Sequence, residues 1–181
     1  DESRLVDQNG IDLLLETVHF LGHLRARLVV LGSGDAGHAD PLRWPAPTFP
    51  DREAFDDGYD PRLAHQIFAG ADLFVMPSRF EPCGLAQMQA MAYGTLPVVT
   101  DLGGLHDTVV DTDADPDHGT GIVAPWPTGA ALTDALHRGA ALHRKRARRV
   151  LAQANGMAVD WSWAGPAADH VANYRAVSHG V

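Results

Sequence analysis

Short apolar runs that alternate with helix-like segments are the feature that most constrains how this chain can fold. Four such runs lie at residues 27–31, 72–76, 96–100 and 121–124, and the last is the weakest. Runs of this length, rich in Val and Leu, are typical of strands buried on both faces of a parallel sheet. Strands that alternate with helices predict an α/β fold, here a Rossmann-like parallel sheet with helices on both faces.

The segments between these runs carry helix signals. Gly10 precedes an apolar pattern with helical spacing, Pro61 suits a first helical turn, and Thr128 and Ser162 are candidate caps. The predicted helices cover residues 11–24, 61–71, 84–93, a short stretch after 104, 128–143, and a last helix that begins near 162.

Two stretches carry other signals. Residues 40–60 include four prolines within ten positions. Proline removes a backbone donor and blocks helix interiors, so we expect mostly loop there. The basic run at residues 143–149 predicts a solvated helix face.

Length and charge exclude several classes of protein. The chain has 181 residues, which suits one domain, and we predict a single domain over residues 1–181. Its net charge of −9, from 14 basic and 23 acidic residues, gives no broad attraction to nucleic acid or to an anionic membrane. No apolar run reaches the ~18 residues of a spanning helix.

Cysteine usage and the first residues bear on localisation. The one cysteine, Cys83, cannot form an internal disulfide, and the opening Asp-Glu-Ser-Arg does not have the pattern of a signal peptide. We therefore expect a cytoplasmic protein, or a plastid protein if the source is a photosynthetic eukaryote. The abrupt start predicts that the chain is a piece of a longer protein.

Three loops that contain glycine follow predicted strands, at residues 32–35, 77–84 and 101–104. Right-handed crossovers place the loops that follow parallel strands along one edge of the sheet. Ligands bind in the crevice at this edge in open α/β sheets. The sequence therefore predicts a ligand site built from these three loops.

The loop "PSRFEPCGL" at residues 77–85 has the most chemistry. Gly84 lets the backbone approach a ligand closely and is expected to open the next helix. Glu81 has two interpretations: its carboxylate accepts hydrogen bonds from sugar hydroxyls, or it caps the following helix. Cys83 is either a nucleophile or a small packing residue, and the loop contains no histidine that would activate a thiol.

Other candidate residues are also open to two interpretations. Gly103 and Gly104 form either a plain turn or a set of amides open to an anion. Arg4 is either a surface residue or a clamp for a diphosphate. Tyr59 either stacks on a base or packs in the core. The histidine pair in the first helix lacks a third ligand, so no metal site is predicted.

Residues 71–109, "ADLFVMPSRFEPCGLAQMQAMAYGTLPVVTDLGGLHDTV", resemble the signature region of bacterial glycogen synthases and starch synthases. The resemblance continues in "SRLVDQNGIDLLLE" (3–16), "LVVLGSGD" (28–35), "GYDPRLAHQIFAGAD" (58–72) and the closing "DWSWAGPAADHVANYRAV". Such enzymes are retaining glycosyltransferases with two Rossmann-like domains that face a cleft, the GT-B arrangement. The chain resembles only the C-terminal half, which binds the nucleotide sugar.

The resemblance implies a donor, an acceptor and roles for particular residues. Such enzymes transfer glucose from ADP-glucose, or UDP-glucose in some relatives, to an α-1,4-glucan without a metal or other cofactor. Glu81 would hold the glucose and Arg4 the diphosphate, and both are implied to be catalytic, while Tyr59 would lie against the adenine. The backbone around the donor would come from two loops, which comprise Cys83, Gly84, Leu85, Leu102, Gly103 and Gly104.

Two positions depart from the family pattern. Asn9 stands where the family has a phosphate-binding lysine, and Leu102 stands where it has threonine. We also expect the proline-rich segment to replace a helix and a strand between Asp35 and Gly58. The resemblance implies that the isolated domain is inactive. A related GT-B enzyme with another donor or acceptor, such as one that makes maltose-1-phosphate, and a non-catalytic regulatory domain remain alternatives.

Overall fold

The computed structural model describes residues 4–34, 36–43 and 53–178. The strands in these residues are β1 (Arg4–Leu5), β2 (Leu28–Gly34), β3 (Glu53–Asp57), β4 (Leu73–Met76), β5 (Leu96–Thr100) and β6 (Ile122–Ala124). The helices are α1 (Ile11–Thr17), α2 (Leu21–Leu24), α3 (Ala36–Arg43), α4 (Pro61–Gly70), α5 (Ala86–Ala92), α6 (Gly103–Thr108), α7 (Gly129–Arg144), α8 (Arg146–Ala158) and α9 (Ala164–Ser178), with 3-10 turns at Asp7–Asn9 and Val18–Phe20.

The strands form two three-stranded sheets in which every pairing is parallel. The first has the order β1-β2-β3 and the second the order β4-β5-β6. Because the strands of each sheet run in the same direction, the loops that follow them lie at one edge. The predicted α/β fold is confirmed.

Alternate side chains of β5 show that the second sheet is covered on both faces. Leu96 and Val98 are buried in a cluster that includes Leu132 and Leu136 of α7. Val99, with the opposite orientation in the strand, is buried against Met91 of α5 and other residues. A strand buried on both faces needs a continuous apolar sequence, which is why "LPVVT" was recognisable as a strand.

The prediction for residues 40–60 is wrong in part. Helix α3 begins at Ala36 and contains Pro41, and strand β3 occupies Glu53–Asp57. Ala39 and Leu42 are buried beside Leu5 and stabilise α3 despite its proline. A helix and a strand are therefore present between Asp35 and Gly58, and residues 44–52 of this segment lie outside the described residues.

Two predicted helices differ in their limits. The helix expected over residues 11–24 is interrupted by the 3-10 turn at Val18–Phe20. The hydroxyl of Thr17 donates to the carbonyl of Leu14 at 2.7 Å, a bond that competes with the regular helical pattern. The helix expected to open at Gly84 begins at Ala86, because Gly84 has a left-handed φ of 72°.

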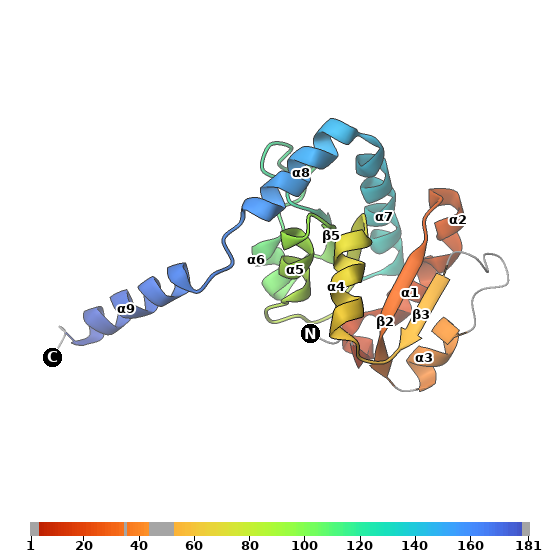
Figure 1. Ribbon diagram of the computed structural model, residues 1–181, viewed down its shortest axis with the longest axis horizontal. Coiled ribbons are helices and arrows are strands. Elements are labelled where there is room, and N and C mark those ends of the chain that lie inside the picture. The colour runs from red at the N-terminus through yellow and green to blue at the C-terminus, as the bar shows by residue number, and fades with distance from the viewer. Residues whose placement is uncertain (1–3, 35, 44–52, 179–181) are drawn as a thin grey trace.

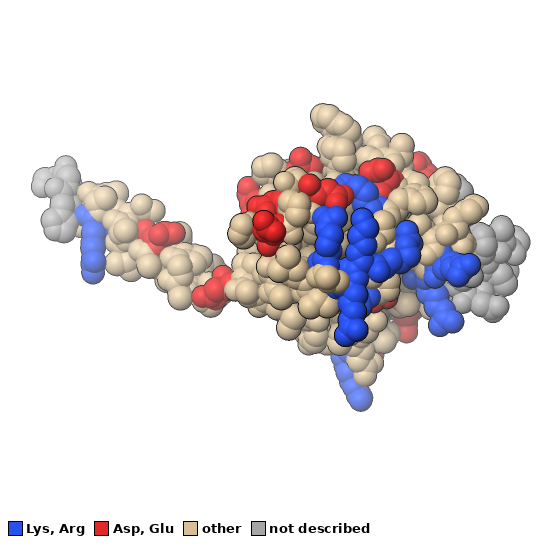
Figure 2. Space-filling model, turned by 90° about the horizontal axis from the view of Figure 1, so that it is seen from above, with Lys and Arg blue, Asp and Glu red and all other residues tan. Residues whose placement is uncertain are grey.

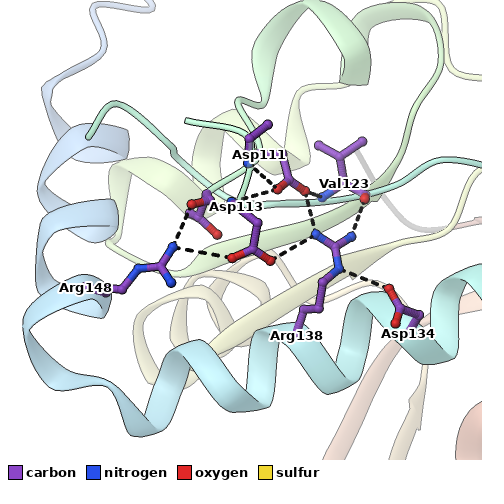
Figure 3. Close-up of polar contacts among 8 residues, drawn as sticks. Asp111, Asp113, Val123, Asp134, Arg138 and Arg148 are labelled. Atoms are coloured by element: carbon purple, nitrogen blue, oxygen red, sulfur yellow. Dashed lines mark hydrogen bonds and ion pairs between the residues drawn. The ribbon is translucent and has the colours of Figure 1, made fainter. Parts of the chain in front are cut away.

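An Arg–Asp network joins α7 to the segment before β6 (Figure 3). Arg138 donates to the carboxylates of Asp111 at 2.9 Å and Asp134 at 3.1 Å, and to the carbonyl of Val123 at 2.6 Å. Hydrogen bonds from backbone N–H groups and from Arg138 hold the pKa of Asp111 below its usual range, although burial opposes this shift. This network fixes α7 against the second sheet.

The predicted solvated basic run lies where α7 ends and α8 begins. Figure 2 shows Lys and Arg side chains gathered at this junction, where Arg144, Lys145 and Arg146 are exposed. Arg148 and Arg149, at the end of the run, are half-buried, so the prediction of a solvated face holds only in part. A helix that follows a parallel strand runs back toward the opposite edge of the sheet, so these charges lie away from the glycine loops. Helix α9 extends away from the other elements (Figure 1), and all of its residues are exposed.

Candidate functional site

The loop at residues 77–85 follows β4 and is bound by backbone contacts to its neighbours. The hydroxyl of Thr100, at the end of β5, donates to the carbonyl of Ser78 at 2.6 Å. The N–H of Arg79 donates to the carbonyl of Gln8 at 2.8 Å, and the Gln8 amide donates to the carbonyl of Phe80 at 3.2 Å. The loop is therefore held from the second sheet and from the segment before α1.

A forked ion pair strengthens the second of these attachments. The two terminal nitrogens of Arg79 donate to the two carboxylate oxygens of Asp12 at 2.6 and 2.7 Å. The hydrogen bond from Arg79, followed by its positive charge, holds the pKa of Asp12 below its ordinary value of 3.8. The planar fork matches a carboxylate, so the pair orients the loop as well as attracting it.

Gly10 allows the segment that contains Asn9 to lie directly against the loop. A Cβ at position 10 would lie 2.0 Å from the carbonyl oxygen of Pro77, and Gly10 has a φ of 68°. A side chain there would be excluded both by the contact and by the backbone conformation. The structure therefore brings Asn9 beside the start of the loop.

The second glycine turn packs on the other side of the same loop. A Cβ on Gly103 would lie 2.0 Å from the carbonyl oxygen of Glu81, and one on Gly104 would lie 1.9 Å from that of Cys83. The N–H of Gly104 donates to the carbonyl of Glu81 at 2.9 Å. Two of the three predicted glycine loops thus form one continuous backbone surface.

Glu81 occupies the middle of this surface. Its side chain is half-buried, and its carboxylate has no hydrogen-bond or ion-pair partner among the described residues. Helix α5 has no side-chain cap, so the alternative in which Glu81 caps that helix does not hold. A carboxylate that has no protein partner and lies on a loop held by its backbone is suited to accept hydrogen bonds from a ligand.

The remaining predicted residues lie at or near the same edge. Cys83 and Leu85 are exposed, and Leu102 is half-buried directly before α6. Tyr59 is 65% exposed, so it does not pack in the core. Its loop follows β3 and lies beside the end of β2, where the N–H of Gly58 donates to the carbonyl of Gly32.

Arg4 lies in β1, where it is opposite Ser33 of β2. The glycine loop predicted at 32–35 is wrong for its described residues, because Gly32, Ser33 and Gly34 continue β2; Asp35 lies outside the described residues. In the described ranges no three His, Cys, Asp or Glu side chains gather closely enough to hold a metal ion. No helix there is both long and apolar enough to cross a membrane.

An ion pair lies at the rim of the second glycine turn. The ring nitrogen Nδ1 of His106 lies 2.6 Å from a carboxylate oxygen of Asp101. The hydrogen bond with Asp101, followed by its negative charge, raises the pKa of His106 above 6.5. The pair with Asp101 thus favours the protonated form of this ring at the rim of the turn.

Sequence reasoning missed the residues that support the loop, namely Gln8, Asp12, Arg79 and Gln87. Gln87 is fully buried, and its amide nitrogen lies within hydrogen-bond distance of the carbonyls of Cys83 and Gly84. The one available signal was their position, since each polar residue lies in a predicted loop or near the start of the predicted helix that follows one. The partners of Gln8, Asp12 and Arg79 are distant in the sequence, so pattern alone could not pair them.

Two glycine-containing loops at one edge of a parallel sheet thus pack together beside a carboxylate that has no partner among the described residues. Residues 3–140 match the family described as "Glycosyl transferases group 1". The chain belongs to this family. Over most of its length it is also similar to bacterial glycogen synthases, with 46% identity to that of Aeromonas salmonicida over 88% of this chain and 53% identity to that of Aeromonas hydrophila over 75%.

A solved structure shows the same similarity. The catalytic domain of starch synthase IV from Arabidopsis thaliana, bound to ADP and acarbose, matches 97% of this chain with a TM-score of 0.86 and 32% identity. The chain covers 37% of that structure, and 33% and 28% of the two Aeromonas synthases. It therefore spans about a third of the length of its relatives and has the fold of a GT-B glycosyltransferase domain.

Proposed function

We propose that this chain is the donor-binding domain of a glycogen or starch synthase. It binds ADP-glucose and, together with the rest of such a protein, transfers glucose to the non-reducing end of an α-1,4-glucan with retention of configuration. The similarity to glycogen synthases supports the reaction. The starch synthase bound to ADP supports the nucleotide.

The observation that carries the proposal is the free carboxylate of Glu81 on a loop held from two sides. Hydroxyls of the donor glucose donate to this carboxylate. Hydrogen bonds to a charged group contribute about 1.5–3 kcal/mol each, which is enough to select a sugar-bearing nucleotide. Because Arg79 and Gly104 already hold the loop, the loop loses little conformational entropy when the sugar binds.

The other predicted residues bind the nucleotide in this proposal. The backbone of Cys83, Gly84 and Leu85 surrounds the sugar. The turn at 102–104 approaches the diphosphate, and Tyr59, already exposed, covers the adenine. Arg4 neutralises the charge that develops on the leaving ADP in the transition state.

Asn9 affects the strength of phosphate binding. It lies beside the loop, where Gly10 packs on Pro77, but its side chain has no positive charge to offer a phosphate. The donor site therefore binds the diphosphate more weakly than a site with lysine at this position. Arg4 provides the main positive charge.

Catalysis also needs an acceptor held against the donor, because the reaction depends on the relative placement of the two sugars. The chain spans about a third of its relatives, and we propose that the acceptor is held by the remainder of such a protein. The chain alone is expected to bind ADP-glucose without transferring its glucose.

Isothermal titration calorimetry of this chain tests the proposed function. ADP and ADP-glucose are expected to bind, and UDP-glucose to bind more weakly. A folded chain that gives no heat with millimolar ADP or ADP-glucose would contradict the proposal. Tighter binding of UDP-glucose would instead indicate a related transferase with another donor.

A further inference from the structure

The buried amide of Gln87 connects the two glycine loops. Its Nε2 lies 3.2 Å from the carbonyl oxygen of Cys83, 2.9 Å from that of Gly84, and 3.1 Å from the hydroxyl oxygen of Thr108. The Thr108 hydroxyl in turn donates to the carbonyl of Gly104 at 2.6 Å. One side chain on α5 therefore binds the 77–85 loop directly, and it binds the second glycine turn through the hydroxyl of Thr108.

These bonds determine which way the loop peptides face. A trans peptide group is planar, with its C=O and N–H on opposite sides. Because the carbonyls of Cys83 and Gly84 point toward Gln87, the N–H groups of Gly84 and Leu85 point away from it. Within the described part of the chain, neither N–H group makes a hydrogen bond. Gln87 thus turns two N–H groups that have no protein partner within the described ranges away from its own side chain, on the loop that also carries Glu81.

The surroundings of Gln87 indicate that its amide serves the loop rather than general stability. Its Oε1 is buried and has no hydrogen-bond partner among the residues that the structure describes, which is unfavourable for a polar atom. Ala86, Ala90 and Met91 on the same helix are buried and apolar. An apolar side chain at position 87 would avoid the unpaired oxygen but would leave the two loop carbonyls without their donor.

We propose that Gln87 is a positioning residue for the sugar donor. It holds the peptide groups of residues 83–85 with their N–H groups toward the ligand, and it connects them to the 104–108 turn. Gln87 does not touch the sugar nucleotide, because its side chain is fully buried. This role rests on the proposed function, since it concerns the same donor site.

Two replacements of similar length separate positioning from packing. Gln87→Met keeps the volume and removes the donor, and Gln87→Glu places a carboxylate opposite three oxygen atoms. The matched control is Gln66→Met on α4, where the side chain is exposed. Circular dichroism and thermal unfolding establish that each variant is folded before ligand binding is measured.

In calorimetry, the Gln87 variants are expected to change the affinity for ADP-glucose much more than the affinity for AMP. Gln87→Met should lower the affinity for ADP-glucose by about tenfold, which corresponds to the loss of about one hydrogen bond. The affinity for AMP should change by less than about twofold. Gln87→Glu should be weaker still for ADP-glucose, and Gln66→Met should match the unaltered chain. Equal losses for both ligands, or unchanged ADP-glucose binding in Gln87→Met, would overturn the proposal.

A second measurement keeps the test independent of the proposed function. If the unaltered chain binds neither ligand, the proposed function fails, but the loop geometry is still accessible by NMR. Gln87→Met should then shift the amide signals of Gly84 and Leu85 and leave those of α4 in place. Unchanged signals for Gly84 and Leu85 would overturn the role of Gln87 whatever the ligand.

Discussion

Replacing Gly104 by alanine tests whether the two glycine loops form one site. The added Cβ would lie 1.9 Å from the carbonyl oxygen of Cys83, whereas such contacts are essentially never shorter than 3.0 Å. The loop would have to move by more than about 1 Å, at a cost of ~1–3 kcal/mol for overpacking. Loss of the hydrogen bond from Gly104 to Glu81 adds ~1 kcal/mol, so Gly104→Ala should destabilise the chain by about 2–4 kcal/mol.

Urea denaturation and ADP-glucose calorimetry measure the two consequences. Gly70→Ala is the control, because Gly70 is also helical and a Cβ there meets nothing within 4 Å. Alanine should be neutral at position 70 or stabilise the helix by up to about 1 kcal/mol. If Gly104→Ala kept its stability to within about 0.5 kcal/mol and still bound ADP-glucose normally, the described packing of the two loops would be incorrect.

Three further predictions concern charged or polar groups. Asp12→Asn removes the forked pair with Arg79 and should cost about 1 kcal/mol or less, since both side chains are more than a third exposed. Because the pair lowers the pKa of Asp12, its contribution to stability is complete above about pH 3.8, and it is lost as the pH falls through the lower pKa of the folded state. Urea denaturation curves of the two proteins, measured at pH 7 and pH 3, should therefore converge in acid. Asn9→Lys should tighten ADP binding by about 10- to 100-fold in calorimetry, and unchanged affinity would show that lysine is not needed there. Arg138→Met leaves the mostly buried Asp111 carboxylate without its cation and should cost about 2–3 kcal/mol in urea denaturation; a cost below 0.5 kcal/mol would show that the network is not stabilising.

The strands at the centre of the second sheet could be predicted because burial on both faces demands apolar residues. Leu96 and Val98 face one helix layer, and Val99 faces the other, so "LPVVT" had no polar residue before its last position. Strand β3, "EAFDD", has the opposite character. In the described part of the chain it lies at the end of its sheet and pairs with β2 alone, so it can form from acidic residues that give no apolar signal.

The candidate site was predictable in part for a similar reason. A loop with Glu81 and Gly84 after a recognisable strand could be placed at the ligand edge from topology alone. The residues that hold this loop could not, because Arg79 and Asp12 are 67 positions apart and Gln87 and Thr108 are 21 apart. Hydrogen bonds over such separations depend on the folded backbone, and no local pattern indicates them.

The most direct test of the central claim is the difference in affinity between ADP-glucose and ADP for the unaltered chain and for Glu81→Gln. The amide keeps the shape of the side chain and removes the charge that is proposed to hold the glucose hydroxyls. The unaltered chain should bind ADP-glucose more tightly than ADP, and Glu81→Gln should reduce that advantage by about 10- to 100-fold with ADP affinity unchanged. An identical advantage in both proteins, or an equal loss for both ligands, would contradict the assignment of Glu81 to the donor sugar.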